Sequence, residues 1–279
     1  MEQLRRDLRR LPPELQPQGS RLCLYSHYSL SPELPAFVRY ALERVQECGF
    51  QVILLTNKHE LNTESNQWLQ AHSIGLCMVR NEGFDFGMWT KYLRVANCQS
   101  LERLWLLNDS VLYYRPIFQD FVTWAEAQSA DAVSLTDNWE LAYHLQSYCL
   151  YLKTPACSIA KTHMDQQGIL KDYTKIVRKL EVGLSGCLLT HGMGLKALYP
   201  QTPDDLPMFL QYIFRIPQGL GFIKRKLLEH RFSPIETLFL TMRNGQEQID
   251  TDYYKLIRET GSPDARCDLG EKKSGSAAL

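Results

Sequence analysis

The sequence has no excess charge of either sign and no long apolar run. Lysine plus arginine and aspartate plus glutamate number 31 each in 279 residues, so no global field draws the chain to nucleic acid or to an anionic membrane. Nowhere do about eighteen apolar residues follow one another, and the charged, proline-containing start of the chain lacks the apolar centre of a signal peptide. We therefore expect a cytoplasmic protein that associates with the inner face of a membrane only peripherally, and no nucleic-acid partner.

Paired cysteines and the short signatures of several enzyme classes are also missing. The eight cysteines are scattered, and none forms the Cys-x-x-Cys pair that zinc sites and dithiol oxidoreductases use. No Gly-x-Gly-x-x-Gly follows the first apolar run, and the chain has no Walker loop, no Gly-x-Ser-x-Gly and no His-Glu-x-x-His. The sequence therefore does not indicate a dehydrogenase, a P-loop enzyme, an α/β-hydrolase or a zinc peptidase.

What the chain does contain is a regular alternation of strand and helix patterns. Hydrophobic residues make up 44% and charged residues 22%, as in an ordinary globular protein. Short apolar runs predict buried strands at residues 22–25, 51–57, 74–79 and 104–107. Such alternation favours an α/β fold with a mainly parallel sheet, helices on both faces, and ligands at the carboxyl ends of the strands.

Helix signals occupy the segments between these runs. Ser31, Pro32 and Glu33 supply an N-cap, an N1 proline and a first-turn acid, so a helix should begin there, and Gly49 can cap its end. Strands are also expected at residues 132–135 and 147–152. Other helices are expected at residues 64–71, 88–95, 159–163, 173–180, 183–193, 207–214 and 224–229, with one more just after Pro116.

Composition divides the chain into three parts. Residues 1–20 form a polar lead-in, residues 21–260 carry the strand and helix patterns, and residues 261–279 are rich in glycine, serine and lysine. No internal repeat or long linker interrupts the middle part. We expect one domain with a helical C-terminal extension from about Ala156, followed by a disordered tail.

The first segment with chemical potential is the loop after the third predicted strand, Arg80-Asn-Glu-Gly-Phe-Asp-Phe-Gly-Met-Trp89. Its glycines, Gly83 and Gly87, permit unusual backbone angles. Arg80 suits a phosphate, and Asp85 suits a ribose or a base. Asp85 is also a favoured helix cap, so a purely structural turn is the alternative.

The second segment is Leu104-Trp-Leu-Leu-Asn-Asp-Ser110, where an apolar strand runs directly into three oxygen-bearing side chains. Asp109 is a hard oxygen ligand at the position where an α/β sheet usually meets its substrate. Sugar transfer from a nucleoside diphosphate requires the departing diphosphate to be neutralised, either by a divalent ion on a carboxylate or by cationic side chains. Asn108 and Asp109 could hold such an ion, and an Asx turn that closes the strand is the alternative.

These two loops belong to a longer ordered set of motifs. The set comprises Arg80 to Trp89, Leu107-Asn-Asp-Ser-Val111, Ser147-Tyr148, Glu181-Val-Gly-Leu-Ser185 and Gly221-Phe-Ile-Lys-Arg-Lys-Leu-Leu228. These motifs, and the order in which they follow one another, resemble those of the rhamnan synthesis F family, over roughly residues 21–231. That family is bacterial and is associated with rhamnose-rich and galactofuranose-containing surface polysaccharides, O-antigens among them.

The resemblance implies a Rossmann-like glycosyltransferase of the A type. It implies a nucleotide-sugar donor carrying rhamnose or galactofuranose, and a glycan acceptor that is lipid-linked. It also assigns Asn81, Gly83, Asp85 and Gly87 to the donor loop. Asn108 and Asp109 stand where such enzymes keep a metal-binding acidic pair, but the usual Asp-x-Asp is absent, which leaves the need for Mg²⁺ or Mn²⁺ open.

The later motifs suggest further roles. Glu181 begins the family's Glu-x-x-Leu-Ser element, where inverting enzymes place the base that deprotonates the acceptor, although a first-turn glutamate also stabilises a helix. Lys224 is expected to contact the diphosphate, and His230, later in the chain, is a candidate metal or phosphate ligand. The alternative for the basic segment that contains both residues is a solvated helix face, which is the more frequent role of such runs. A non-catalytic carbohydrate-binding or scaffolding subunit with the same fold is the rival hypothesis, and retention of Asp85, Asp109 and Glu181 favours the enzyme.

Overall fold

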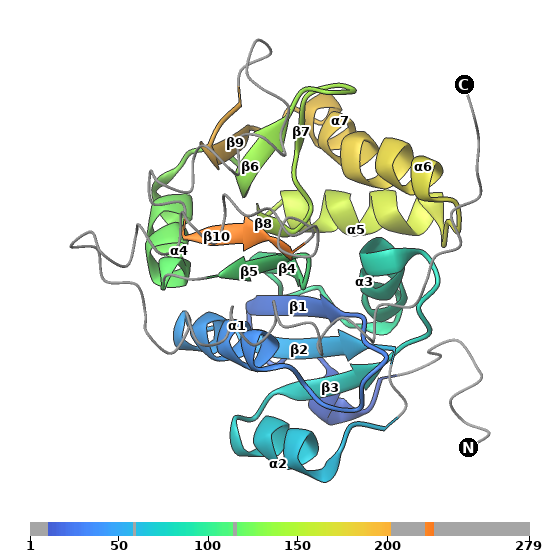
Figure 1. Ribbon diagram of the computed structural model, residues 1–279. Coiled ribbons are helices and arrows are strands. Elements are labelled where there is room, and N and C mark those ends of the chain that lie inside the picture. Colours follow the sequence, from blue (N-terminus) through green and yellow to red (C-terminus); the bar gives the residue numbers. More distant parts are fainter. Residues whose placement is uncertain (1–10, 58–59, 114–115, 202–220, 226–279) are drawn as a thin grey trace, which may run out of the picture.

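The apolar runs of the sequence form the middle of an eight-stranded sheet covered by helices (Figure 1). The computed structural model describes residues 11–57, 60–113, 116–201 and 221–225. The strands follow the order β3-β2-β1-β4-β8-β6-β7, and β9 also pairs with β6. Within the described part of the chain, no helix is long and apolar enough to cross a membrane.

The first half of the sheet is parallel. β1 (Arg21–His27) lies between β2 (Gln51–Thr56) and β4 (Arg103–Asn108), and β3 (Gly75–Met78) continues the sheet beyond β2. All four strands point the same way, so their last residues lie at one edge of the sheet. This carboxyl edge collects the polar side chains that follow the strands.

The second half mixes directions. β8 (Cys149–Lys153) runs antiparallel to β4 and to β6 (Ala132–Asn138), and β9 (Leu195–Tyr199) runs parallel to β6. The two-residue strand β7 (His144–Leu145) pairs with the end of β6. Because β8 is reversed, its first residues, and not its last, reach the carboxyl edge beside Asn108.

Helices cover both faces of the sheet (Figure 1). One face carries α1 (Ala36–Glu47) and α4 (Ile117–Ala127), with α2 (Thr63–Ala71) beyond the edge strands. The other carries α3 (Phe84–Val95), α5 (Ala156–Gln167) and a continuous helix made of α6 (Tyr173–Ile176), a π-helical turn (Val177–Glu181) and α7 (Val182–Thr190). The N-terminal segment adds a short 3-10 helix at Pro13–Leu15.

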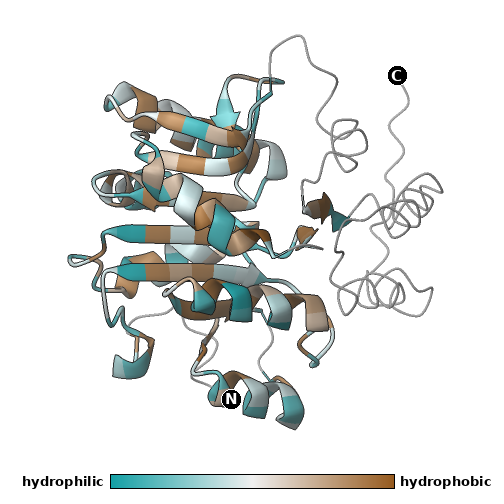
Figure 2. Ribbon diagram, turned by 90° about the vertical axis from the view of Figure 1, so that its left-hand side faces the viewer, coloured by the Kyte–Doolittle hydropathy of each residue, from teal (hydrophilic) through white to brown (hydrophobic). Residues whose placement is uncertain are grey.

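The core has two halves because neighbouring strand residues point to opposite faces. On β1, Cys23 and Tyr25 pack with α1 and α4, whereas Leu22 and Leu24 pack with α3 and α5. The strands are accordingly apolar in their middle, with hydrophilic residues at some of their ends (Figure 2). The expected fold class is therefore confirmed: a Rossmann-like α/β arrangement with a mostly parallel central sheet between two layers of helices.

Three predicted helix starts were displaced, among them that of α5, which begins at Ala156 and not at residue 159. The first helix begins at Ala36 and not at Ser31, because Ser31 Oγ accepts the Glu33 N–H and the Pro32 carbonyl accepts the Asn62 N–H, which keeps this segment in a loop. Its end at Gly49 is as expected, with φ +79°. The helix expected from residue 88 begins earlier, at Phe84.

The C-terminal part is less helical than expected. The helices after Ala156 are present, but β9 returns the chain to the sheet, and Lys224 lies in the strand β10 (Phe222–Lys224), not in a helix. β10 pairs with β5 (Val111–Tyr113), directly after the polar end of β4. The expected helix at 207–214, the remainder of 224–229 and the tail at 261–279 lie outside the described residues.

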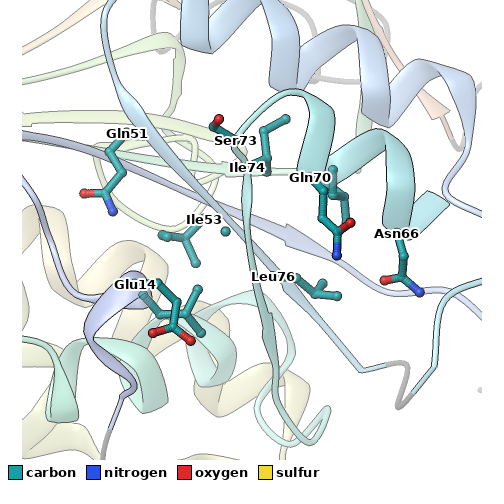
Figure 3. Close-up of a pocket in the computed structure, with 11 residues that line it drawn as sticks. Glu14, Gln51, Ile53, Asn66, Gln70, Ser73, Ile74 and Leu76 are labelled. Carbon is teal, nitrogen blue, oxygen red and sulfur yellow. The ribbon is translucent and has the colours of Figure 1, made fainter.

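A pocket of about 370 Å³ lies at the opposite end of the parallel strands (Figure 3). Gln51 and Gly75, the first residues of β2 and β3, line it together with side chains of α2 and Glu14. The polar residues predicted for catalysis follow strand ends, so this pocket is remote from them.

The start of α3 requires glycine at position 87. A Cβ atom there would lie 1.8 Å from the carbonyl oxygen of Glu82, whereas a Cβ at Gly186, in α7, would meet nothing within 4 Å. We expect Gly87→Ala to lower the free energy of unfolding by about 2 kcal/mol or more, since backbone must move. Gly186→Ala should leave it unchanged or raise it by up to about 1 kcal/mol. Chemical denaturation measures both, and equal effects of the two variants would contradict this account.

Candidate active site

Polar side chains from three elements meet at the carboxyl edge of the sheet. Ser26 and His27 end β1, Asn108 ends the neighbouring strand β4, and Asp109 follows it. Asp85 reaches the same edge from the first turn of α3. Ser26 and Asn108 are direct partners in the parallel register, which fixes their spacing by backbone pairing alone.

Asp85 ties α3 to both strands. Its Oδ1 accepts the Ser26 hydroxyl at 2.6 Å, and its Oδ2 accepts the Asn108 amide at 2.8 Å. The Asn108 Oδ1 in turn accepts the Ser110 hydroxyl at 2.6 Å and its N–H at 3.0 Å. Asp85 therefore positions the turn that carries Asp109, a role that needs no ligand.

Burial raises the pKa of Asp85 from 3.8 to about 7. The hydrogen bond from Ser26 opposes this shift, while the negative charges of Asp109 and Glu181 add to it. The carboxyl group is thus partly protonated near neutral pH. Glu181 is accordingly close enough for its charge to act on the Asp85 cluster.

Asp109 is held between two nitrogen-bearing side chains. His27 Nδ1 lies 2.7 Å from Asp109 Oδ2, and Arg225 Nη1 lies 3.0 Å from the same oxygen. Burial alone would raise the pKa of Asp109, but the hydrogen bonds and charges of His27 and Arg225 hold that pKa below its ordinary value. Asp109 is therefore an anion, and His27 must carry its proton on Nδ1 because a carboxylate can only accept.

Glu181 lies on the helix that borders the antiparallel half of the site. Its Oε1 accepts the Ser147 hydroxyl at 2.8 Å and the Ser147 N–H at 3.2 Å. Both donors come from the segment that leads into β8, which starts at the carboxyl edge. Its Oε2 makes no hydrogen bond with any residue in the described ranges, so one oxygen of this carboxylate can accept a further donor.

The backbone around Glu181 is unusual. Residues Val177–Glu181 form a π-helical turn, closed by the Val182 N–H on the Val177 carbonyl. Such turns are rare and frequently occur at functional sites. The sequence pattern predicted Glu181 in the first turn of a helix, but a helical turn already precedes it, so the first-turn explanation of this glutamate was wrong.

The glycines of the predicted donor loop have structural roles. Gly83 has φ +84° and caps α3, and Gly87 approaches the Glu82 carbonyl too closely for any side chain. Arg80 and Asn81 are exposed at the start of this loop. The Arg80 carbonyl accepts the buried Lys91 ammonium at 2.9 Å, so the main chain of Arg80 is fixed while its side chain faces solvent.

The predicted basic segment reaches the site through β10. Lys224 Nζ lies 4.2 Å from the ring centroid of Tyr148, beside the segment that holds Glu181. The next residue, Arg225, contacts Asp109. His230, the predicted late ligand, lies outside the described residues.

The side chains of this edge do not fit a divalent ion. Both oxygens of Asp85 are bonded to Ser26 and Asn108, and Asp109 Oδ2 is shared by His27 and Arg225. Among the described residues, no group of three or more His, Cys, Asp or Glu side chains could hold a metal ion. Mg²⁺ prefers about six oxygen ligands in octahedral geometry, far more than this arrangement offers.

Sequence reasoning missed Ser26, His27 and Arg225 as site residues. Ser26 and His27 end β1, so the rule that placed Asp109 at a strand end would also have found them. Arg225 lies beside the predicted Lys224, but no short-range pattern shows which of two adjacent cations turns toward Asp109. Their contacts join residues 82 and 116 positions apart in the chain.

Comparison with known proteins finds only distant structural similarity. No protein-family model matches the chain, and no curated protein matches it. Solved structures that resemble it include one described as a glucose-1-phosphate thymidylyltransferase from Bacillus anthracis in complex with a sucrose. It is 12% identical over 65% of this chain and 87% of that chain, with a TM-score of 0.44.

Two further structures are similarly distant. A cytidylyltransferase from Leptospira borgpetersenii is 12% identical, covering 87% of this chain and 95% of that chain, with a TM-score of 0.40. A 4-diphosphocytidyl-2C-methyl-D-erythritol synthase from Anaerococcus prevotii is 9% identical, covering 68% and 93%, with a TM-score of 0.38. Likeness this remote does not extend to substrate or reaction.

The raised pKa of Asp85 predicts a pH dependence of stability. An unfolded aspartate loses its proton near pH 3.8 and folded Asp85 near pH 7, so the folded state binds more protons between these values. The free energy of unfolding contributed by Asp85 should fall as pH rises through that window, and the loss should be complete above it. Asp85→Asn mimics the protonated form and should lack this decline. Denaturant titrations between pH 5 and 8 measure both proteins, and parallel curves would refute the assignment.

Proposed function

We propose that the protein is a glycosyltransferase that takes a sugar from a nucleoside-diphosphate donor. The observation that carries the proposal is the pairing of Glu181 with Ser147 at the same edge as the Asp109 and Arg225 ion pair. A base for the acceptor and a cation for the leaving diphosphate are the two groups that such a transfer needs.

The proposed reaction is a single displacement. Glu181 takes the proton of an acceptor hydroxyl, whose oxygen forms a bond to the anomeric carbon of the donor sugar. The bond between that carbon and the diphosphate breaks, and the diphosphate leaves with the electron pair. Because attack and departure occur on opposite faces of the carbon, the product has inverted configuration.

The donor side is supported by position and charge. Ligands of open α/β sheets bind beyond the carboxyl ends of parallel strands, where β1 and β4 end in this protein. Arg225 and Lys224 bring positive charge to that edge from β10. Divalent metal fits poorly there, so no step of the proposed reaction depends on one.

The sugar and the acceptor rest on the resemblance to the rhamnan synthesis F family. That resemblance favours rhamnose or galactofuranose as the sugar and a lipid-linked bacterial polysaccharide as the acceptor. Thermal unfolding in the presence of nucleoside-diphosphate sugars tests the donor, because a ligand that binds only the folded state raises the melting temperature. We expect a uridine or deoxythymidine diphosphate sugar to raise it.

A non-catalytic carbohydrate-binding subunit with the same fold is the second candidate. It would bind glycans without releasing a nucleoside diphosphate. The enzyme is preferred because two donors of Ser147 fix the Glu181 carboxylate in place. The negative charge of Glu181 also raises the pKa of the buried Asp85, and a binding module has no need of such a charge there. Release of the nucleoside diphosphate during incubation with donor and acceptor separates the two candidates.

The proposed base predicts a separation of binding from chemistry. Glu181→Gln keeps an oxygen for the Ser147 donors but cannot take a proton. We expect donor affinity to stay within about threefold of wild type, while the transfer rate falls by about a hundredfold to ten-thousandfold. Isothermal titration with the donor and a turnover assay measure the two quantities.

The matched control is Glu33→Gln, which removes one exposed carboxylate from the loop before α1. It should change neither quantity. If Glu181→Gln weakened donor binding and kept the maximal rate, Glu181 would be a binding residue. A product with the donor's own anomeric configuration, read by NMR coupling constants, would rule out the single displacement.

A further inference from the structure

Arg225 is fixed beside Asp109 through a single guanidinium nitrogen. Its Nη1 donates to the Asp109 carbonyl oxygen at 2.9 Å and lies 3.0 Å from Asp109 Oδ2. Its remaining N–H groups make no hydrogen bond or ion pair with any residue in the described ranges. A guanidinium has five N–H donors, so most of those on Arg225 stay available to a ligand.

The position of Arg225 is rigid because its backbone is also paired. Its N–H donates to the Ser110 carbonyl at 3.0 Å, directly after the antiparallel pairing of β10 with β5. The guanidinium carbon lies 5.0 Å from the ring centroid of Phe37, in the first turn of α1. The side chain is therefore held from three directions and keeps a quarter of its surface exposed.

Two buried polar atoms next to this pair have no partner within the described part of the chain. They are His27 Nε2 and the Tyr25 hydroxyl, on the same face of β1, and both side chains are at least nine-tenths buried. Tyr25 interacts electrostatically with both Asp109 and Arg225. An unpaired buried polar atom costs about 1–3 kcal/mol, so a polar ligand or an ordered water is expected to complete this site.

We propose that Arg225 neutralises the diphosphate of the donor in place of a divalent ion. This inference rests on the proposed function. Asp109 and His27 are positioning residues that orient the guanidinium through Asp109 Oδ2. The free edge of Arg225 matches two phosphate oxygens, a geometry that arginine provides and a point charge does not.

The same geometry opposes a metal at Asp109. An ion bound to Oδ2 would displace Arg225 or lie close to its positive charge. Within the described ranges, Asp109 Oδ1 is the only carboxylate oxygen of Asp85 and Asp109 without a partner. Charge neutralisation by Arg225 needs no rearrangement of these contacts. The arginine and the metal are therefore alternatives.

The first test is nucleotide binding with and without metal. Titration calorimetry with UDP and with dTDP should give dissociation constants in EDTA within about twofold of those in Mg²⁺ or Mn²⁺. Mn²⁺ alone, followed by electron paramagnetic resonance, should show no stoichiometric binding. A tenfold loss of nucleotide affinity in EDTA that Mn²⁺ restores would overturn the inference and leave the proposed function intact. Failure of both nucleotides to bind would instead count against the proposed function.

The second test uses variants of Arg225 in EDTA. Arg225→Gln should weaken UDP or dTDP binding by about tenfold to a hundredfold, as the loss of charge-assisted hydrogen bonds implies, and Arg225→Lys should be intermediate. Arg94→Gln is the matched control, since it removes an arginine paired with Asp165 at the far end of α3. Thermal unfolding of each variant checks the fold. Equal affinities of wild type and Arg225→Gln would overturn the inference.

A double-mutant cycle tests the positioning role of Asp109. If Asp109 acts through Arg225, Asp109→Asn should weaken nucleotide binding in the wild-type background and have no further effect when Arg225 is glutamine. A purely structural loss would lower affinity equally in both backgrounds. That result would remove Asp109 from the proposed arrangement.

Discussion

The ion pair at Asp109 joins three parts of the chain that are far apart in sequence. Through Asp109 Oδ2, the end of β1 meets the turn after β4, and β10 is brought back over both. His27 contributes a hydrogen bond from within the sheet, and Arg225 contributes charge from outside it. Without this shared oxygen, Arg225 would keep only its contacts to the main chain and to Phe37.

The aspartate of the predicted donor loop, Asp85, has a structural role within the described part of the chain. The loop from Arg80 to Gly87 reads as a donor-binding loop, yet its two glycines meet the backbone needs of the turn and of α3. Its aspartate bonds to the ends of β1 and β4. The loop therefore fixes α3 against the carboxyl edge of the sheet, beside Asn108 and the turn that carries Asp109.

Local sequence patterns were enough to predict the parallel half of the sheet. β1, β2 and β4 each contain a continuous apolar run, as strands buried on both faces do, and a helix follows β1, β2 and β3 in the chain. The short strands β5, β7 and β10 have two or three residues and exist only through their partners, so no periodicity could show them. The Ser31 helix start failed for a related reason, since a contact with Asn62 holds Pro32 in a loop.

The site residues also divide into those that local sequence could predict and those that depend on contacts between distant segments. Asp85, Asn108, Asp109 and Glu181 were predicted, and the structure brings all four to the carboxyl edge, with Asp85 bonded directly to Asn108. The pairing of Arg225 with Asp109 depends on how β10 lies against β5, a contact between segments more than a hundred residues apart. A local pattern could not choose between Lys224 and Arg225.

Three carboxylates share this edge, and each is accommodated by a different physical means. Asp109 stays ionised because His27 and Arg225 lower its pKa, whereas burial and the neighbouring negative charges raise that of Asp85. Glu181 has neutral donors from Ser147 and no cationic partner among the described residues. A carboxylate that is tightly paired with a cation is a poor base, and Asp85, with both oxygens engaged by Ser26 and Asn108 and its pKa near 7, is partly protonated near neutral pH. Of the three, Glu181 is therefore the group whose surroundings suit proton abstraction, and the other two shape the field in which it would act.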